Sequence, residues 1–165
     1  MKKVVLFTLV AVTAFAVGAF AQTPNFSGKW VLDPAKTEMG GAPGGGPPGG
    51  GGARGAGGGM AGPITITQTA TEMTIEQTMG ENVMKTVYRL DGKESVNEGR
   101  GGMKSTYVSK WDGAKLLTTI KRETQQGTRE STEVRSLAAD GTMVVETTSQ
   151  GPSGPTTRKM VYNKQ

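Results

Sequence analysis

Carboxylates are the side chains of this sequence best suited to acid–base chemistry, because the chain contains no histidine and no cysteine. The closest carboxylate pairs are Glu94 with Glu98 and Glu130 with Glu133. On a β-strand, residues four apart share a face, whereas residues three apart lie on opposite faces. Neither pair forms a recognised catalytic arrangement, although two carboxylates can hydrolyse glycosides without histidine.

The other residue types that carry catalysis are missing or have structural explanations. Without histidine and cysteine, zinc sites of the Cys/His type, serine–histidine triads and cysteine–histidine dyads cannot form. Asp91, Asp112 and Asp140 each precede a glycine, and Asp33 precedes Pro34. The sequence therefore predicts that this protein is not an enzyme, has no catalytic residues or metal site, and needs no cofactor.

Short runs rich in Thr, Val, Ile and aromatic residues, separated by turn signals, predict β-strands along most of the chain. Residues 34–39 could form a short helical turn at most. The predicted strands are Phe26–Leu32, Ile64–Thr69, Met73–Met79, Val83–Leu90, Lys93–Asn97, Met103–Trp111, Lys115–Glu123, Thr128–Leu137, Thr142–Thr148 and Thr157–Asn163.

Three Asp-Gly pairs punctuate these runs, at Asp91-Gly92, Asp112-Gly113 and Asp140-Gly141. Asp-Gly between alternating runs predicts a tight hairpin of the type in which both central residues have positive φ. Successive hairpins with short connections imply an antiparallel up-and-down meander. Such a meander leaves exposed edges unless it closes, so we expect an all-β barrel of 8–10 strands. A split into two packed sheets is the alternative.

The first residues predict export. Lys2 and Lys3 precede an uncharged apolar run over residues 4–17, and Ala19-Phe20-Ala21 has the small-x-small pattern of a signal-peptidase site. The run is shorter than the ~20 residues that span a bilayer. We therefore expect a signal peptide at 1–21, no membrane span after cleavage, and a periplasmic or secreted protein.

The expected mature chain, residues 22–165, has the length of one domain. Residues 40–62 are dominated by glycine with interspersed proline, which predicts a disordered loop interrupting the barrel. The formal charge of +5 becomes +3 when Lys2 and Lys3 leave with the signal peptide. Because the remaining basic residues are scattered among acidic ones, we expect no nucleic-acid partner.

The segment Phe26–Pro34 reads Phe-Ser-Gly-Lys-Trp-Val-Leu-Asp-Pro, and Trp-Asp-Gly follows at Trp111. These stretches resemble small exported lipocalin-like proteins, calycin-type barrels with a Gly-x-Trp opening and mostly without assigned function. The resemblance implies that Gly28, Trp30 and Arg158 close one end of the barrel, with the arginine lying over the tryptophan. Such a contact is a cation–π interaction. The absence of disulfides and the long Gly-rich segment depart from the pattern.

Aromatic residues that face the interior of a barrel can either fill the core or contact a ligand. The candidates for ligand binding are Trp30, Tyr88, Tyr107, Trp111 and Tyr162. The leading hypothesis is an exported, non-enzymatic barrel that binds a small, fairly apolar ligand. The alternative is a solid-cored structural module that contacts a protein of the cell envelope through the Gly-rich loop or a strand edge.

Overall fold

The computed structural model describes residues 23–38, 62–99, 102–125, 127–151 and 154–165. The predicted signal peptide at 1–21 lies outside the described residues, as does the predicted Gly-rich loop at 40–62 except for Gly62. Within the described ranges, no helix is long and apolar enough to cross a membrane.

The described chain is all-β, as predicted, and each of the ten predicted strands is present with its ends shifted by a few residues at most. The strands are β1 (Gly28–Leu32), β2 (Ile64–Gln68), β3 (Glu72–Met79), β4 (Asn82–Arg89), β5 (Glu94–Glu98), β6 (Lys104–Asp112), β7 (Lys115–Thr124), β8 (Gly127–Leu137), β9 (Met143–Gly151) and β10 (Gly154–Lys164).

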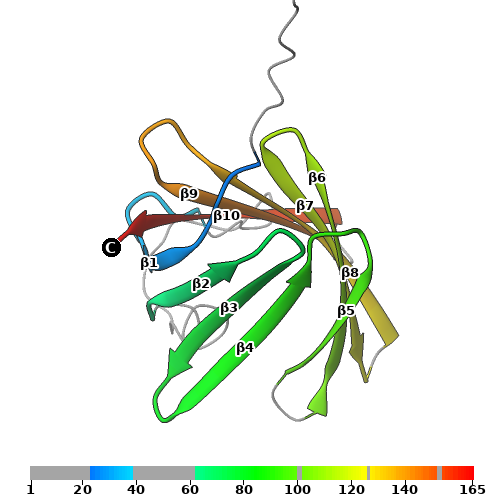
Figure 1. The fold of residues 1–165 in the computed structure, drawn as a ribbon. Coiled ribbons are helices and arrows are strands. Elements are labelled where there is room, and N and C mark those ends of the chain that lie inside the picture. The colour runs from blue at the N-terminus through cyan, green and yellow to red at the C-terminus, as the bar shows by residue number, and fades with distance from the viewer. Residues whose placement is uncertain (1–22, 39–61, 100–101, 126, 152–153) are drawn as a thin grey trace, which may run out of the picture.

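The ten strands form one antiparallel sheet in the order β4-β3-β2-β1-β10-β9-β8-β7-β6-β5. Consecutive strands pair with each other except β4 and β5, which form the two edges of the sheet, and β1 also pairs with β10. The sheet curls into a nearly closed barrel in which β4 and β5, its two edges, approach each other at one end (Figure 1). This confirms the predicted up-and-down barrel.

The sheet folds around an apolar core because alternate residues of each strand point inward. On β7, for example, Leu116, Thr118 and Ile120 are buried, whereas Leu117 and Thr119 between them are less so. One end of the barrel interior is packed solid by fully buried side chains. They are Phe26, Trp30, Ile66, Met73, Leu116 and Met143.

The turns at Asp91, Asp112 and Asp140 occur where predicted, but the turn at Asp91 is not a hairpin, because β4 and β5 are the edges of the sheet and do not pair. The backbone of all three turns also differs from the prediction. Among the described residues, only glycines have positive φ, and Gly92, Gly113 and Gly141 have φ of 79°, 56° and 81°. The aspartates instead keep ordinary backbone conformations. Two of them use their carboxylates to cap the turn, since the N–H groups of Lys93 and Thr142 donate to Asp91 and Asp140.

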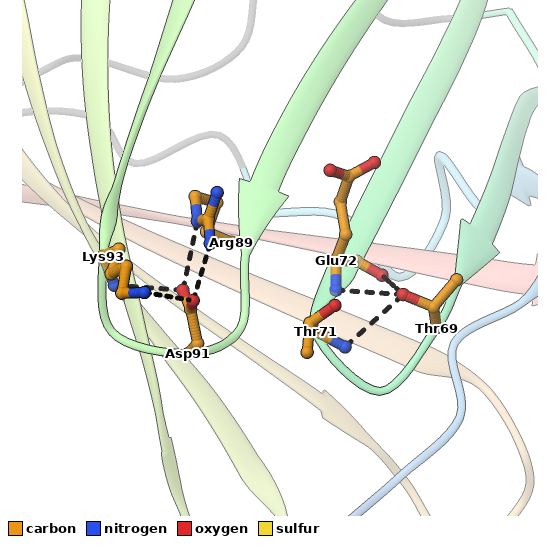
Figure 2. Close-up of polar contacts among 6 residues, drawn as sticks. All are labelled: Thr69, Thr71, Glu72, Arg89, Asp91 and Lys93. Atoms are coloured by element: carbon orange, nitrogen blue, oxygen red, sulfur yellow. Dashed lines mark hydrogen bonds and ion pairs between the residues drawn. The ribbon is translucent and has the colours of Figure 1, made fainter.

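Two neighbouring turns at one end of the barrel are held by side chains (Figure 2). In the β2–β3 turn, the Thr69 hydroxyl accepts hydrogen bonds from the N–H groups of Thr71 and Glu72. In the β4–β5 turn, Asp91 accepts two hydrogen bonds from the Arg89 guanidinium, at 2.7 and 3.2 Å. These local bonds fix the two turns, of which the β2–β3 turn joins paired strands and the β4–β5 turn joins the two edges of the sheet.

Candidate functional site

A cavity of about 720 Å³ occupies the other end of the barrel interior and opens toward the β3–β4, β5–β6, β7–β8 and β9–β10 connections. This volume lies within the ~300–1,000 Å³ that is usual for small-molecule sites. We call its buried lining residues the floor and its exposed lining residues the mouth. The apolar part of the wall consists of Ile64, Ile75, Met84, Ile120, Val145 and Met160.

The three tyrosines predicted as ligand-binding candidates all line this cavity. The Tyr88 ring on the edge strand β4 meets the Tyr107 ring on β6 edge to face, with centroids 5.1 Å apart. Burial is the main cause of a raised pKa at Tyr88, Tyr107 and Tyr162, with the largest effect at fully enclosed Tyr88. The phenols therefore stay neutral at physiological pH and present hydroxyl groups inside the barrel.

The two tryptophans predicted as ligand-binding candidates lie in the solid end of the barrel instead. Trp30 is 1% exposed, and its indole Nε1–H donates to the carbonyl of Phe26 at 2.8 Å. The partly buried ring of Trp111 stacks on the ring of Phe26 at 6.0 Å. Neither tryptophan is among the residues that line the cavity.

Barrel closure around Trp30 uses a different cation from the one predicted. The ammonium of Lys164 lies 5.4 Å from the centre of the Trp30 ring, while Arg158 lines the cavity. The register explains the correction: β10 pairs Lys164 with Trp30, and Arg158 lies six residues back along the same strand, opposite Thr147. Gly28, with φ of 136°, allows the Lys164 side chain to cross its Cα.

A buried ion pair on β8 is the feature that the sequence analysis did not find. Arg135 is 4% exposed and donates from Nη2 to Oε1 of Glu133 at 2.8 Å. Its Nη1 contacts the Met143 sulfur at 3.5 Å, and its guanidinium carbon lies 5.6 Å from the centre of the Tyr88 ring. Burial by itself lowers the pKa of Arg135, but Glu133 and Tyr88 outweigh it and raise the pKa overall. Arg135 therefore stays charged.

The register between β7 and β8 could have predicted that both side chains of this pair face inward. The turn between β7 and β8 pairs Thr124 with Gly127, which sets Leu116 opposite Arg135 and Thr118 opposite Glu133. Cross-strand partners share a face of the sheet, so the inward face of β7 identifies the inward face of β8. Strand β8 does not show this by itself, because both of its faces are mostly polar.

In each carboxylate pair first considered for catalysis, the two side chains lie in different surroundings. Glu94 is exposed on β5, whereas Glu98 lies at the mouth of the cavity. Glu130 is also at the mouth, and Glu133 is held by Arg135 at the floor. Among the described residues, no group of three or more acidic side chains could hold a metal ion.

Comparisons with known proteins give a match in structure only. No family model and no curated protein matches this chain. Among solved structures, the REP1-NXSQ fatty acid transporter is similar with a TM-score of 0.54 and 12% identity, over 84% of this chain and 95% of that one. This likeness shows the fold alone, an antiparallel β-barrel.

Two further structures match over a smaller part of the chain. The zebrafish ileal bile acid-binding protein complexed with cholic acid has a TM-score of 0.47 and 20% identity, over 62% of this chain and 72% of that one. Secretory abundant heat soluble protein 4 from Ramazzottius varieornatus has a TM-score of 0.49 and 21% identity, over 62% of this chain and 68% of that one.

Proposed function

We propose that this barrel binds one small, largely apolar molecule in its cavity. The observation that carries the proposal is the open volume of about 720 Å³ at one end of a barrel whose other end is packed solid. A barrel built only as a scaffold would gain stability from filling this space, since interiors normally pack as densely as organic crystals. An unfilled cavity with an opening is therefore better explained by a ligand.

The lining favours an apolar body with a few polar groups. Aliphatic and methionine side chains of β2, β3, β4, β7, β9 and β10 would bury the body of the ligand, at roughly 25 cal/mol per Å² of apolar surface. The hydroxyls of Tyr88, Tyr107 and Tyr162 would orient its polar atoms. The fatty acid transporter that shares the fold supplies a ligand class to test, namely single-chain lipids.

Filling the cavity from within tests this proposal. Ser131 is a small cavity-lining residue of β8, and its neighbour Thr132 is exposed on the outer face of the same strand. We expect Ser131→Trp to abolish binding of the apolar fluorescent probe N-phenylnaphthylamine, because the indole occupies the ligand's space. Thr132→Trp, which adds the same ring outside, should bind like the wild type. Equal binding by both variants would place the probe outside the cavity and contradict the proposal.

We also propose that the protein is exported, non-catalytic and free of cofactors. Export rests on the predicted signal peptide at 1–21, and the mass of the mature protein purified from its native source tests the cut after Ala21. The non-catalytic assignment rests on the lack of histidine and cysteine and on the pairing of Glu133 with Arg135.

The alternative of an interaction module stays a prediction. Its Gly-rich loop lies outside the described residues, and the sheet does have two edge strands, β4 and β5. Part of that edge is already occupied, because side chains of β5 bond the backbone of β4 at Val87. Because part of this edge is occupied and the barrel contains a cavity, ligand binding is favoured over strand addition.

A further inference from the structure

The buried Arg135–Glu133 pair leaves one strong hydrogen-bond donor without a partner. Arg135 lines the cavity, and its Nε is the buried side-chain nitrogen or oxygen for which the described residues supply no acceptor. Its other contacts include one carboxylate oxygen, a thioether sulfur and a phenol ring. Sulfur is a weak acceptor, and an unsatisfied buried donor is costly. A ligand that offers an acceptor oxygen here would remove that cost.

The charge at this position is already balanced. Glu133 and Arg135 form an ion pair at 2.8 Å, with side chains 11% and 4% exposed. A carboxylate arriving at Arg135 would therefore place a second negative charge beside Glu133 in a site shielded from water, where like charges repel strongly. A neutral carbonyl or hydroxyl oxygen would accept the same hydrogen bond without adding charge.

We propose, on the basis of the ligand-binding function above, that the cavity floor recognises a neutral acceptor oxygen of the ligand through Arg135, and that Glu133 excludes a carboxylate from this position. Glu133 is thus a specificity-determining residue. It selects by making the wrong ligand unfavourable, which is a common route to specificity. The ligand class this favours is a lipid-like alcohol, ester or ketone that enters with its polar end at the floor.

The arginines elsewhere in the cavity do not reproduce this selection. Arg122 and Arg129 are opposite each other at the mouth and are exposed to water, where ion pairs with a ligand are worth little. Glu98 and Glu130 lie at the same mouth. Arg158 is partly buried on the wall and is the residue most able to attract an anion, so it serves as the control.

Two probes with the same chain, dodecyl alcohol and dodecanoate, test the proposal when each displaces N-phenylnaphthylamine at neutral pH. The measured quantity is the ratio of the two dissociation constants, acid over alcohol. Glu133→Gln removes the negative charge and keeps the side-chain shape. It should lower this ratio by about tenfold or more, the scale of one charge-assisted hydrogen bond. Arg158→Gln should not lower the ratio.

The outcomes separate this inference from the proposed function. If neither probe binds the wild type, ligand binding itself is wrong. If both bind and Glu133→Gln leaves the ratio unchanged, the role of Glu133 is wrong while ligand binding stands.

A measurement on the wild-type protein covers the case in which Glu133→Gln does not fold. The Nε–H resonance of Arg135 in a ¹⁵N-labelled sample should shift when dodecyl alcohol saturates the cavity and stay in place with dodecanoate. A larger shift with dodecanoate would overturn the proposal.

Discussion

The side chain of Asn97 on β5 replaces a missing backbone ladder by bonding both polar groups of Val87 on β4. The Val87 N–H donates to Asn97 Oδ1 at 2.7 Å, and Asn97 Nδ2 donates to the Val87 carbonyl at 2.9 Å. The hydroxyl of Ser95 donates to the same carbonyl at 2.7 Å. The two edges of the sheet are thus joined by side chains, beside the contact between the Tyr88 and Tyr107 rings.

We expect Asn97→Ala to destabilise the protein by about 1–3 kcal/mol, because it removes the acceptor of the Val87 N–H and one of the two donors to the Val87 carbonyl. Equilibrium unfolding in urea measures the loss, and faster amide exchange at Val87 would locate it at the junction of β4 and β5. Glu94→Ala, on the exposed face at the other end of β5, is the matched control and should change stability little. Equal effects from the two substitutions would show that the Asn97 bonds do not hold this junction.

Gly28→Ala should destabilise the protein by about 1–3 kcal/mol, since alanine disfavours a φ of 136°. The added methyl group would also lie 2.8 Å from Cε of Lys164 and push this side chain off the Trp30 ring. Thermal unfolding measures the cost. Gly141→Ala is the control for backbone strain alone. Alanine is also disfavoured at its φ of 81°, but the added methyl group would have open space around it. A Gly28→Ala protein as stable as the wild type would contradict the assigned role of Gly28.

Acid should weaken the β4–β5 turn. The Arg89 guanidinium is the main cause of a pKa of Asp91 well below its ordinary value of 3.8. Because the folded pKa is the lower one, the unfolded chain binds the proton first, and stability falls as pH drops from about 3.8 toward the lowered value. Asp91→Asn should therefore be less stable than the wild type at neutral pH, with a difference that shrinks in acid.

Urea unfolding of the wild type and Asp91→Asn at several pH values checks this. Asp112→Asn, in the turn between β6 and β7, tests whether the effect belongs to the Arg89–Asp91 contact. A stability difference between wild type and Asp91→Asn that grows in acid would have the wrong sign.

At alkaline pH, the protein should unfold in the same step in which its tyrosines ionise. Burial raises the pKa of the chain's three tyrosines above the usual value of 10.0. Their stabilising effect is complete below pH 10 and is lost as pH rises toward the folded pKa values, because the unfolded chain ionises first. Absorbance of tyrosinate and circular dichroism should therefore change in one step. Tyrosine ionisation well before loss of structure would show that these rings are accessible.

The fold was predictable because local signals agree along this chain. Alternating residues on β3 and β4 and the glycine-containing turns predict ten strands, and the structure contains them, although β4 and β5 do not pair as a hairpin. The turn geometry was predicted less well. The aspartates avoid positive φ by leaving that conformation to the following glycine, and then cap the turn with their side chains at Asp91 and Asp140.

The site was predictable only in part. Tyrosines on alternating positions suggested an inward face, and Tyr88, Tyr107 and Tyr162 do line the cavity. The tryptophans were predicted either to fill the core or to contact a ligand. In the structure both contact Phe26 in the core. The Glu133–Arg135 pair depends on register across three strands, which composition does not reveal.

The most direct test is a nuclear magnetic resonance titration of ¹⁵N-labelled protein, residues 22–165, with dodecyl alcohol. Ligand binding in the cavity predicts saturable shifts at amides of cavity-lining residues such as Ser131, Arg135 and Thr147. The exposed outer-face amide of Thr132 should shift less. Absence of saturable shifts up to the solubility limit, or shifts confined to the outer face, would contradict the proposal that this barrel binds a ligand in its cavity.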